Sequence, residues 1–261
     1  MKTNYHTHMY LCGHAVGSIE DYCISAIENG FDILGFSDHG HIKVGMMSDI
    51  DYIRTSSKNM TIDEFHNIYL NDIKLMNNKY PMLKVLAGLE TEFVEGYESY
   101  YYDLSKSLDY MILGVHFVVK DGICIDAYHE LNESNVLLYA NNVERALDSG
   151  LFKIIAHPDL FLYSVNKFSL IHEIVSKRII ESAIKNNVYL EINGNGMRVK
   201  PNIHYKYPRD EFFNIVKKYP NAKLVIGYDA HHPKFLVESR IDHIKEFIKK
   251  HSLIISEVID I

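Results

Sequence analysis

Short, continuously apolar runs alternate with longer amphipathic stretches along the whole chain. A short apolar run bounded by polar residues is typical of a strand buried on both faces of a parallel sheet. The amphipathic stretches repeat their apolar positions at helical spacing, which predicts helices that cover such a sheet. We expect seven strands, at residues 2–9, 33–37, 84–89, 110–115, 153–156, 188–193 and 223–227.

Capping residues mark where the intervening helices begin and end. Ser18 precedes one amphipathic stretch and Gly30 follows it, a pattern typical of a helix start and stop. Residues 41–60 and 118–132 are expected to be loops, and the last residues, 253–261, a short closing element. Helices are expected at residues 18–30, 61–78, 100–107, 169–186, 209–218 and 236–249, with one more that closes at Gly150.

The alternation of strands and helices predicts an α/β fold with a parallel sheet. Seven such units in 261 residues favour a seven-stranded barrel related to the TIM barrel, formed by one domain, residues 1–261. A doubly wound open sheet is the alternative. The chain lacks the glycine-rich signatures of dinucleotide and P-loop sites, so neither site is indicated.

The abundance of histidine adds a functional indication to this fold prediction. The chain has 15 histidines, and histidine is both the commonest metal ligand and the usual acid or base near neutral pH. Its three cysteines, Cys12, Cys23 and Cys124, form no Cys-x-x-Cys pair, which argues against a disulfide framework and a cysteine-rich zinc site. This usage, and an N-terminal segment without a signal-peptide core, predict a cytoplasmic protein.

Charge and hydropathy narrow the classes of partner. The formal net charge of −7 and the absence of a basic stripe make nucleic acid an unlikely partner. No apolar run approaches the ~20 residues that cross a bilayer, so we expect no membrane span. The sequence carries no clear mark of an oligomeric state.

Side chains that bind metals follow six of the seven expected strands. Because the carboxyl ends of barrel strands meet at one mouth, we expect these side chains to converge there. Imidazoles and carboxylates without thiolates suit Zn, Mn or Fe in a site with several ions. The candidate ligands are His6, His8, His14, His39, Glu90, His116, His157, Asp229 and His231.

The order of these motifs is similar to that of a known family. The motifs are His6-x-His8, Cys12-Gly-His-Ala15, Ser37-Asp-His39, Gly88-Leu-Glu90, Gly114-Val-His-Phe117, Ala156-His-Pro-Asp-Leu160, Glu191-Ile-Asn193 and Asp229-Ala-His231. Together they resemble the polymerase and histidinol phosphatase (PHP) family of metal-dependent phosphoesterases, and most of all its histidinol-phosphate phosphatase branch. The resemblance extends to about Pro233. It implies a distorted seven-stranded (β/α) barrel with three divalent metal ions, Zn, Mn or Fe, at its mouth.

The resemblance also implies how the ligands are shared. One metal would be held by His6, His8, Glu90 and Asp229, and Glu90 would bridge to a second. His116 and His157 would complete the second site, and the third would be held by His14, His39 and His231. Since a metal lowers the pKa of bound water and a metal pair clamps the attacking and leaving oxygens, we expect a hydroxide held at Glu90 and Asp229 to attack phosphorus.

Further residues near these motifs are candidates for supporting roles. By the same resemblance, Arg198 is expected to grip the phosphate, with a solvated loop arginine as the alternative. His41 and His232 could contact substrate or protonate the leaving group. Asp38 and Asp159 either orient an imidazole or serve as strand-end and capping residues.

For the remaining acidic and histidine residues the expected roles are structural. Glu92 and Glu191 are more readily explained as surface or supporting groups than as ligands. The other histidines are expected mostly at the surface: His66, His129, His172, His204, His243 and His251.

The leading functional hypothesis is a small-molecule phosphomonoesterase. By resemblance, its substrate is L-histidinol phosphate, cleaved to L-histidinol and phosphate in histidine biosynthesis. The alternatives are another phosphorylated metabolite, a nucleotide, or a metal-binding module without catalysis. An amidohydrolase would usually need a ligand lysine after a middle strand, and none is apparent.

Overall fold

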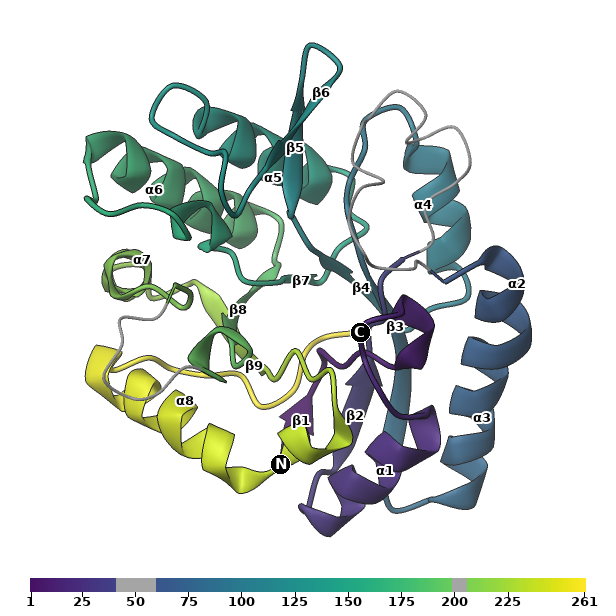
Figure 1. The fold of residues 1–261 in the computed structure, drawn as a ribbon. Coiled ribbons are helices and arrows are strands. Elements are labelled where there is room, and N and C mark those ends of the chain that lie inside the picture. The colour runs from purple at the N-terminus through teal and green to yellow at the C-terminus, as the bar shows by residue number, and fades with distance from the viewer. Residues whose placement is uncertain (41–59, 199–205) are drawn as a thin grey trace.

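Seven parallel strands curl into a nearly closed barrel with helices around its outside (Figure 1). The computed structural model describes residues 1–40, 60–198 and 206–261. The strand order β1-β2-β3-β4-β7-β8-β9 follows the chain without reversal, so the predicted barrel is confirmed and the doubly wound sheet is wrong. The strands are β1 (Thr3–Asn4), β2 (Ile33–Phe36), β3 (Lys84–Thr91), β4 (Tyr110–Leu113), β7 (Ile154–Ile155), β8 (Tyr189–Asn193) and β9 (Lys223–Gly227).

The helices cover the barrel close to where their apolar periodicity predicted. The expected helix over 61–78 contains one π-helical turn, Phe65–Tyr69, between α2 and α3. No helix in the described ranges is both long and apolar enough to cross a lipid bilayer. The helices are α1 (Ile19–Glu28), α2 (Ile62–Glu64), α3 (Leu70–Lys79), α4 (Glu98–Ser105), α5 (Leu137–Asp148), α6 (Leu170–Lys185), α7 (Asp210–Val216) and α8 (Glu238–His251).

The first strand is much shorter than predicted. We expected extended chain from residue 2 to 9, but β1 ends at Asn4. The Asn4 side chain accepts a hydrogen bond from the His6 backbone N–H at 3.2 Å and donates to Thr7 Oγ1 at 2.7 Å. Such local side-chain bonds compete with the strand ladder and bend the chain. His6 and His8 therefore lie on a bent segment beyond the strand.

The expected loop at 118–132 contains a β-hairpin instead. Strands β5 (Phe117–Lys120) and β6 (Ile123–Asp126) pair antiparallel, with Lys120 opposite Ile123. Asp121-Gly122 forms the turn, and both residues have positive φ angles, 53° and 75°. An Asp-Gly pair between two β-branched runs is a strong hairpin signal, so this element was predictable from the sequence.

The seam between the first and last strands closes differently at its two ends. At the mouth, Thr7 pairs with Ala230, and the His8 N–H donates to the Ala230 carbonyl at 2.9 Å. At the opposite end the C-terminal segment fills the gap, since the Ser256 N–H donates to the Leu224 carbonyl at 2.8 Å. The chain end accordingly lies near the barrel axis in Figure 1.

A tyrosine-centred core fills the barrel below the mouth. Tyr110 is buried, and its hydroxyl lies 2.9 Å from the Phe36 carbonyl. A Cβ at Gly35 would lie 2.2 Å from that hydroxyl, and one at Gly88 would lie 2.5 Å from the Tyr110 ring. The two glycines thus admit a large ring where strands β2 and β3 face β4, and the filled interior leaves the mouth as the place for chemistry.

Candidate metal centre

The mouth of the barrel contains a cavity of about 270 Å³. Eight of the nine predicted ligands line it, and the ninth, His6, is buried directly beside His8. Tyr128 and Asn195 complete the lining. The structure therefore brings together the ends of strands that are far apart in the sequence.

Ligand atoms of His6, His8 and Glu90 lie within 4.8 Å of one another, and an Asp229 oxygen lies beside the two histidines. His6 Nε2 is 3.0 Å from His8 Nε2 and 3.3 Å from Glu90 Oε2, and His8 Nε2 is 3.4 Å from Glu90 Oε2. Asp229 Oδ1 lies 3.4 Å from His8 Nε2 and 3.8 Å from His6 Nε2. Bonds of about 2.1 Å to a tetrahedral metal place ligand atoms about 3.4 Å apart. The distances from each carboxylate oxygen to the two histidine nitrogens, and between those nitrogens, are close to that spacing.

The other oxygen of Glu90 faces a second group. Glu90 Oε1 is 3.1 Å from His157 Nε2 and 3.7 Å from His116 Nε2. The three ligand atoms lie within 4.8 Å of one another. Because its two oxygens face two different groups, the Glu90 carboxylate has the geometry of a bridging ligand.

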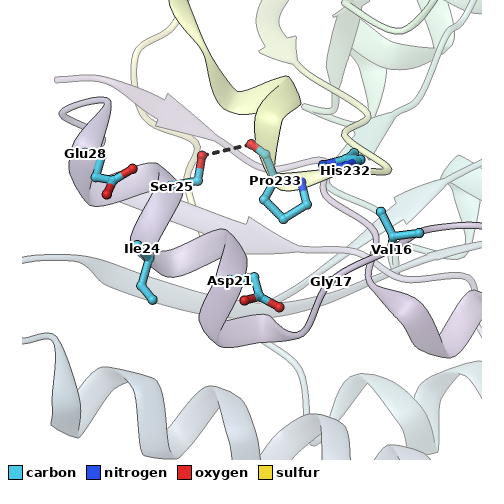
Figure 2. Close-up of a pocket in the computed structure, with 8 residues that line it drawn as sticks. All are labelled: Val16, Gly17, Asp21, Ile24, Ser25, Glu28, His232 and Pro233. Carbon is cyan, nitrogen blue, oxygen red and sulfur yellow. Dashed lines mark hydrogen bonds between the residues drawn. The ribbon is translucent and has the colours of Figure 1, made fainter.

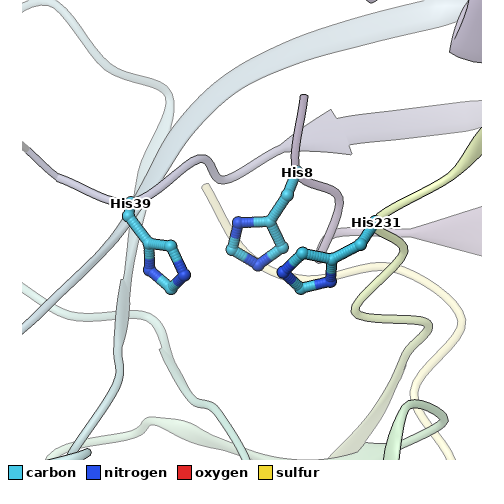
Figure 3. Close-up of side chains that lie close together, drawn as sticks. All are labelled: His8, His39 and His231. Carbon is cyan, nitrogen blue, oxygen red and sulfur yellow. The ribbon is translucent and has the colours of Figure 1, made fainter. Parts of the chain in front are cut away.

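A third group consists of imidazoles from three separate segments. His8, His39 and His231 converge on one region, with ligand atoms within 4.8 Å of one another (Figure 3). His14 joins them through its Nε2, which is 2.9 Å from His231 Nε2. His39 Nδ1 is also 3.3 Å from Glu90 Oε2. His8 thus lies close to this group as well as the first.

Burial and charge at the mouth both favour bound cations. Burial alone would lower the pKa of His6, but Glu191, Glu90 and Asp229 raise it to about 10. Burial would raise the pKa of Glu90, yet the surrounding histidines, His6 first, hold it well below its ordinary value. Buried carboxylates persist only when paired or coordinated to a metal. Imidazole nitrogens and carboxylate oxygens are the donor set of divalent transition metals, so the residues fit such ions.

Two glutamates hold the outer nitrogens of two predicted ligand histidines. Glu191 Oε1 accepts from His6 Nδ1 at 2.7 Å, and Glu92 Oε1 accepts from His116 Nδ1 at 2.6 Å. These bonds leave Nε2 of each ring facing the mouth. Glu191 was expected at the surface or in a supporting role. Its position inside the apolar strand β8 signalled a buried partner, because an unpaired carboxylate there would be costly.

Two glycines leave space for the carboxylates. A Cβ on Gly227 would lie 1.6 Å from Glu191 Oε1, and a Cβ on Gly114 would lie 2.7 Å from Glu90 Oε1. Any larger residue at Gly227 would displace the Glu191 carboxylate from its position beside His6. The glycine that ends strand β9 and the glycine that follows β4 therefore allow the two carboxylates to take up their positions.

Asparagine amides fix the position of Asp229. Asn193 Nδ2 and Asn195 Nδ2 lie 3.2 and 3.0 Å from Asp229 Oδ2. The backbones of Asp229 and His157 have φ angles of 47° and 30°, in the left-handed region. Such strain tends to gather at functional sites. Asn195 was not among the predicted site residues, and its only signal in the sequence was its place after a motif strand.

The two candidate supporting aspartates differ in what they contact. Asp38 is fully buried, and its Oδ1 lies 3.5 Å from His8 Nδ1. Asp159 instead accepts a hydrogen bond from the backbone N–H of Arg209, just before α7. Burial raises the pKa of Asp159 to about 7, although the Arg209 N–H partly lowers it. Asp159 thus holds the segment that leads into α7, while Asp38 lies beside the ring of His8, a predicted ligand.

The candidate substrate residues are placed less directly. Arg198 ends a short 3-10 turn, Gly196–Arg198, but its side chain lies outside the described part of the structure, as does all of His41. His232 lines a separate cavity of about 450 Å³ beside α1, together with Asp21 and Pro233 (Figure 2). The His232 ring accepts a hydrogen bond from the Lys234 N–H at 3.2 Å. His232 is therefore not among the residues that line the mouth cavity.

Two histidines expected at the surface are buried for structural reasons. His172 Nδ1 accepts from the Ser169 N–H at 3.1 Å and caps α6. His251 Nε2 lies 2.7 Å from Asp210 Oδ1 and ties α8 to α7. The surface prediction was wrong for both, because each ring finds a polar partner inside.

Known proteins with similar sequences and folds include phosphatases. A family model described as "PHP domain" matches residues 4–195. A Deinococcus radiodurans protein named "Probable histidinol-phosphatase" is 27% identical over 254 residues, covering 92% of this chain and 90% of that protein.

Solved structures that share the fold include the following two. One is a Listeria monocytogenes protein named for the same activity, with a TM-score of 0.77, 20% identity, and coverage of 90% of this chain and 97% of that one. The other is histidinol phosphate phosphatase from Lactococcus lactis, complexed with Zn, L-histidinol and phosphate. Its TM-score is 0.72 at 17% identity, over 100% of this chain and 99% of that one.

Proposed function

Because the chain belongs to the PHP domain family, we propose that it is a metal-dependent phosphomonoesterase that hydrolyses L-histidinol phosphate to L-histidinol and phosphate. The observation that carries the proposal is the Glu90 carboxylate, whose two oxygens face imidazoles of every group at the mouth. The name of the Deinococcus relative and the ligands of the Lactococcus structure support the choice of substrate. The same proposal places the reaction in histidine biosynthesis in the cytoplasm.

The proposed cofactors are three divalent cations, Zn, Mn or Fe, held by the nine predicted ligands. When bound, such ions neutralise charge on the phosphoryl group and supply a nucleophile by lowering the pKa of water to about 7. The chain supplies the positions of the ligand atoms. Glu191 keeps a proton on His6 Nδ1 and Glu92 keeps one on His116 Nδ1, so both Nε2 atoms present lone pairs to the mouth.

The proposal assigns the carboxylates of Glu90 and Asp229 to holding the nucleophile. Asp229 Oδ1 and Glu90 Oε2 both lie 3.4 Å from His8 Nε2, so two anionic ligands share one neighbour. The asparagine amides on Asp229 Oδ2 leave Oδ1 directed to the mouth. We assign Arg198 to the phosphate oxygens on the resemblance alone, since a guanidinium matches them in shape and charge.

A substrate panel with the purified, metal-loaded protein tests this proposal. We expect phosphate release from L-histidinol phosphate to exceed that from nucleotides and sugar phosphates. Glu90→Gln should lower both metal content and turnover, the latter at least about a hundredfold, as loss of a key charge-stabilising group typically does. Glu95→Gln is the matched control, because Glu95 is an exposed partner of Arg145.

Two outcomes would contradict the proposal in different ways. Faster release from another phosphomonoester would leave the metal chemistry standing and replace the substrate. Bound metal without turnover on any phosphoester would favour a non-catalytic metal-binding module.

A further inference from the structure

One aromatic ring stands at the rim of the cavity. Tyr128 follows the β5–β6 hairpin and lines the mouth beside His116 and His157. Apart from the predicted ligands, only Tyr128 and Asn195 line this cavity within the described residues. The Asn195 amide is directed to Asp229, so Tyr128 supplies the ring surface there.

The backbone of Tyr128 is anchored on both sides. Its N–H donates to Asp126 Oδ1 at 2.6 Å, and its carbonyl accepts from Ser164 Oγ at 2.6 Å. The preceding residue, Ala127, donates its N–H to the carbonyl of His116 at 2.8 Å. The hairpin therefore ties the ring position directly to a predicted metal ligand.

The ring itself is oriented by its aromatic neighbours. Tyr163 meets it edge to face, with ring centroids 5.1 Å apart and planes at 79°. The His116 ring lies nearly parallel to it, at 6.0 Å between centroids and 11° between planes. A ring held this way loses little conformational entropy when a ligand packs against it.

We propose that Tyr128 binds the organic group of the substrate and gives the enzyme its preference for a flat or cationic leaving group. This inference rests on the proposed function of the same site. The predicted ligands form most of the cavity wall, so the ester-linked group of a phosphoryl group bound to them is left the remaining lining, in which Tyr128 is the aromatic side chain beside Asn195.

The chemistry of a tyrosine face decides which groups gain from this contact. An imidazole stacks on it or meets it edge to face, and a protonated amine or imidazolium is attracted to it. A glycerol group, which has neither a ring nor a charge, gains neither interaction. Tyr128 thus selects between leaving groups that share the same phosphoryl chemistry.

The test compares kcat/KM for L-histidinol phosphate and for glycerol phosphate in three variants of the metal-loaded protein. The measured quantity is the ratio of kcat/KM for L-histidinol phosphate to kcat/KM for glycerol phosphate. Tyr128→Leu should lower this ratio about threefold to tenfold, mainly by raising KM for L-histidinol phosphate. Tyr128→Phe keeps the ring and should keep most of the ratio. Tyr102→Leu is the matched control, because Tyr102 is an exposed tyrosine on α4 that does not line the cavity.

Metal content, measured in parallel, separates recognition from damage to the centre. Unchanged metal content with a reduced ratio supports the inference. An unchanged ratio in Tyr128→Leu, or an equal loss for both substrates, overturns it and leaves the proposed function intact. Absence of turnover in the unaltered protein overturns both.

Discussion

Replacing Glu191 by glutamine should weaken metal binding although Glu191 is not a predicted ligand. Three donors converge on its two oxygens. His6 Nδ1 reaches Oε1 at 2.7 Å, and the His157 N–H and Asn193 Nδ2 reach Oε2 at 2.8 and 2.7 Å. A glutamine has one acceptor oxygen and one amide nitrogen. In either orientation the amide nitrogen faces at least one N–H donor.

The size of the effect follows from which contact is lost. If the amide oxygen stays with His157 and Asn193, the amide nitrogen faces His6 Nδ1. His6 must then carry its proton on Nε2, the atom that faces His8 and Glu90, and so loses its ligand lone pair. If the amide is reversed, buried donors meet, at about 1–3 kcal/mol. We expect metal affinity at the His6-containing group to fall about 10- to 100-fold, the range for loss of such a supporting partner.

Competition with a chelator during zinc titration measures this effect directly. Glu92→Gln is the matched variant, because Glu92 supports His116 in the second group. Glu92→Gln should weaken the binding of a different metal ion, the one at the group that contains His116. Glu95→Gln, at an exposed ion pair, should change nothing. Wild-type zinc affinity and stoichiometry in Glu191→Gln would refute the claim that this carboxylate sets the tautomer of His6.

Two further predictions concern stability and metal content. Gly227→Ala should displace Glu191, since the new Cβ would lie 1.6 Å from its Oε1. The free energy of unfolding, measured with urea, should fall by about 1–3 kcal/mol, and the zinc content should fall as well. Wild-type zinc content in this variant would contradict the prediction. Burial raises the pKa of Asp159 to about 7 from 3.8, so the folded state binds this proton more tightly than the unfolded state. Its contribution to stability should fall by up to about 1.4 kcal/mol per pH unit as pH rises from about 4 to 7. As the pH rises through that range, Asp159→Asn should become more stable relative to the unaltered protein. A difference in the free energy of unfolding that stays constant with pH would contradict a raised pKa for Asp159.

The barrel fold and the set of residues at its mouth could be predicted because both follow from the local pattern of apolar and polar residues. Apolar runs such as residues 85–89 are buried on both faces, so they show as uninterrupted hydrophobic sequence. Residues such as Glu90 and His116 stand at the ends of these runs. Parallel connectivity then brings those ends to one side of the barrel, whatever the details of packing.

Other features depend on side-chain contacts and on docking between elements, which the hydrophobic pattern does not record. The bend after Asn4 arises from side-chain bonds to Thr7 and to the His6 backbone, and the hydrophobic period does not reveal it. The β5–β6 hairpin did leave a sequence signal, Asp121-Gly122, yet only its docking places Tyr128 at the rim.

For this protein, the sequence by itself determined the order of strands and helices, and which residue types end the strands. The tertiary structure decided which oxygen of Glu90 faces which imidazole, that His14 meets His231, and that Glu191 lies under His6. The reason is physical. A strand's burial is recorded in its neighbours along the chain, but a contact a few ångströms long between side chains 185 positions apart depends on how the whole barrel closes.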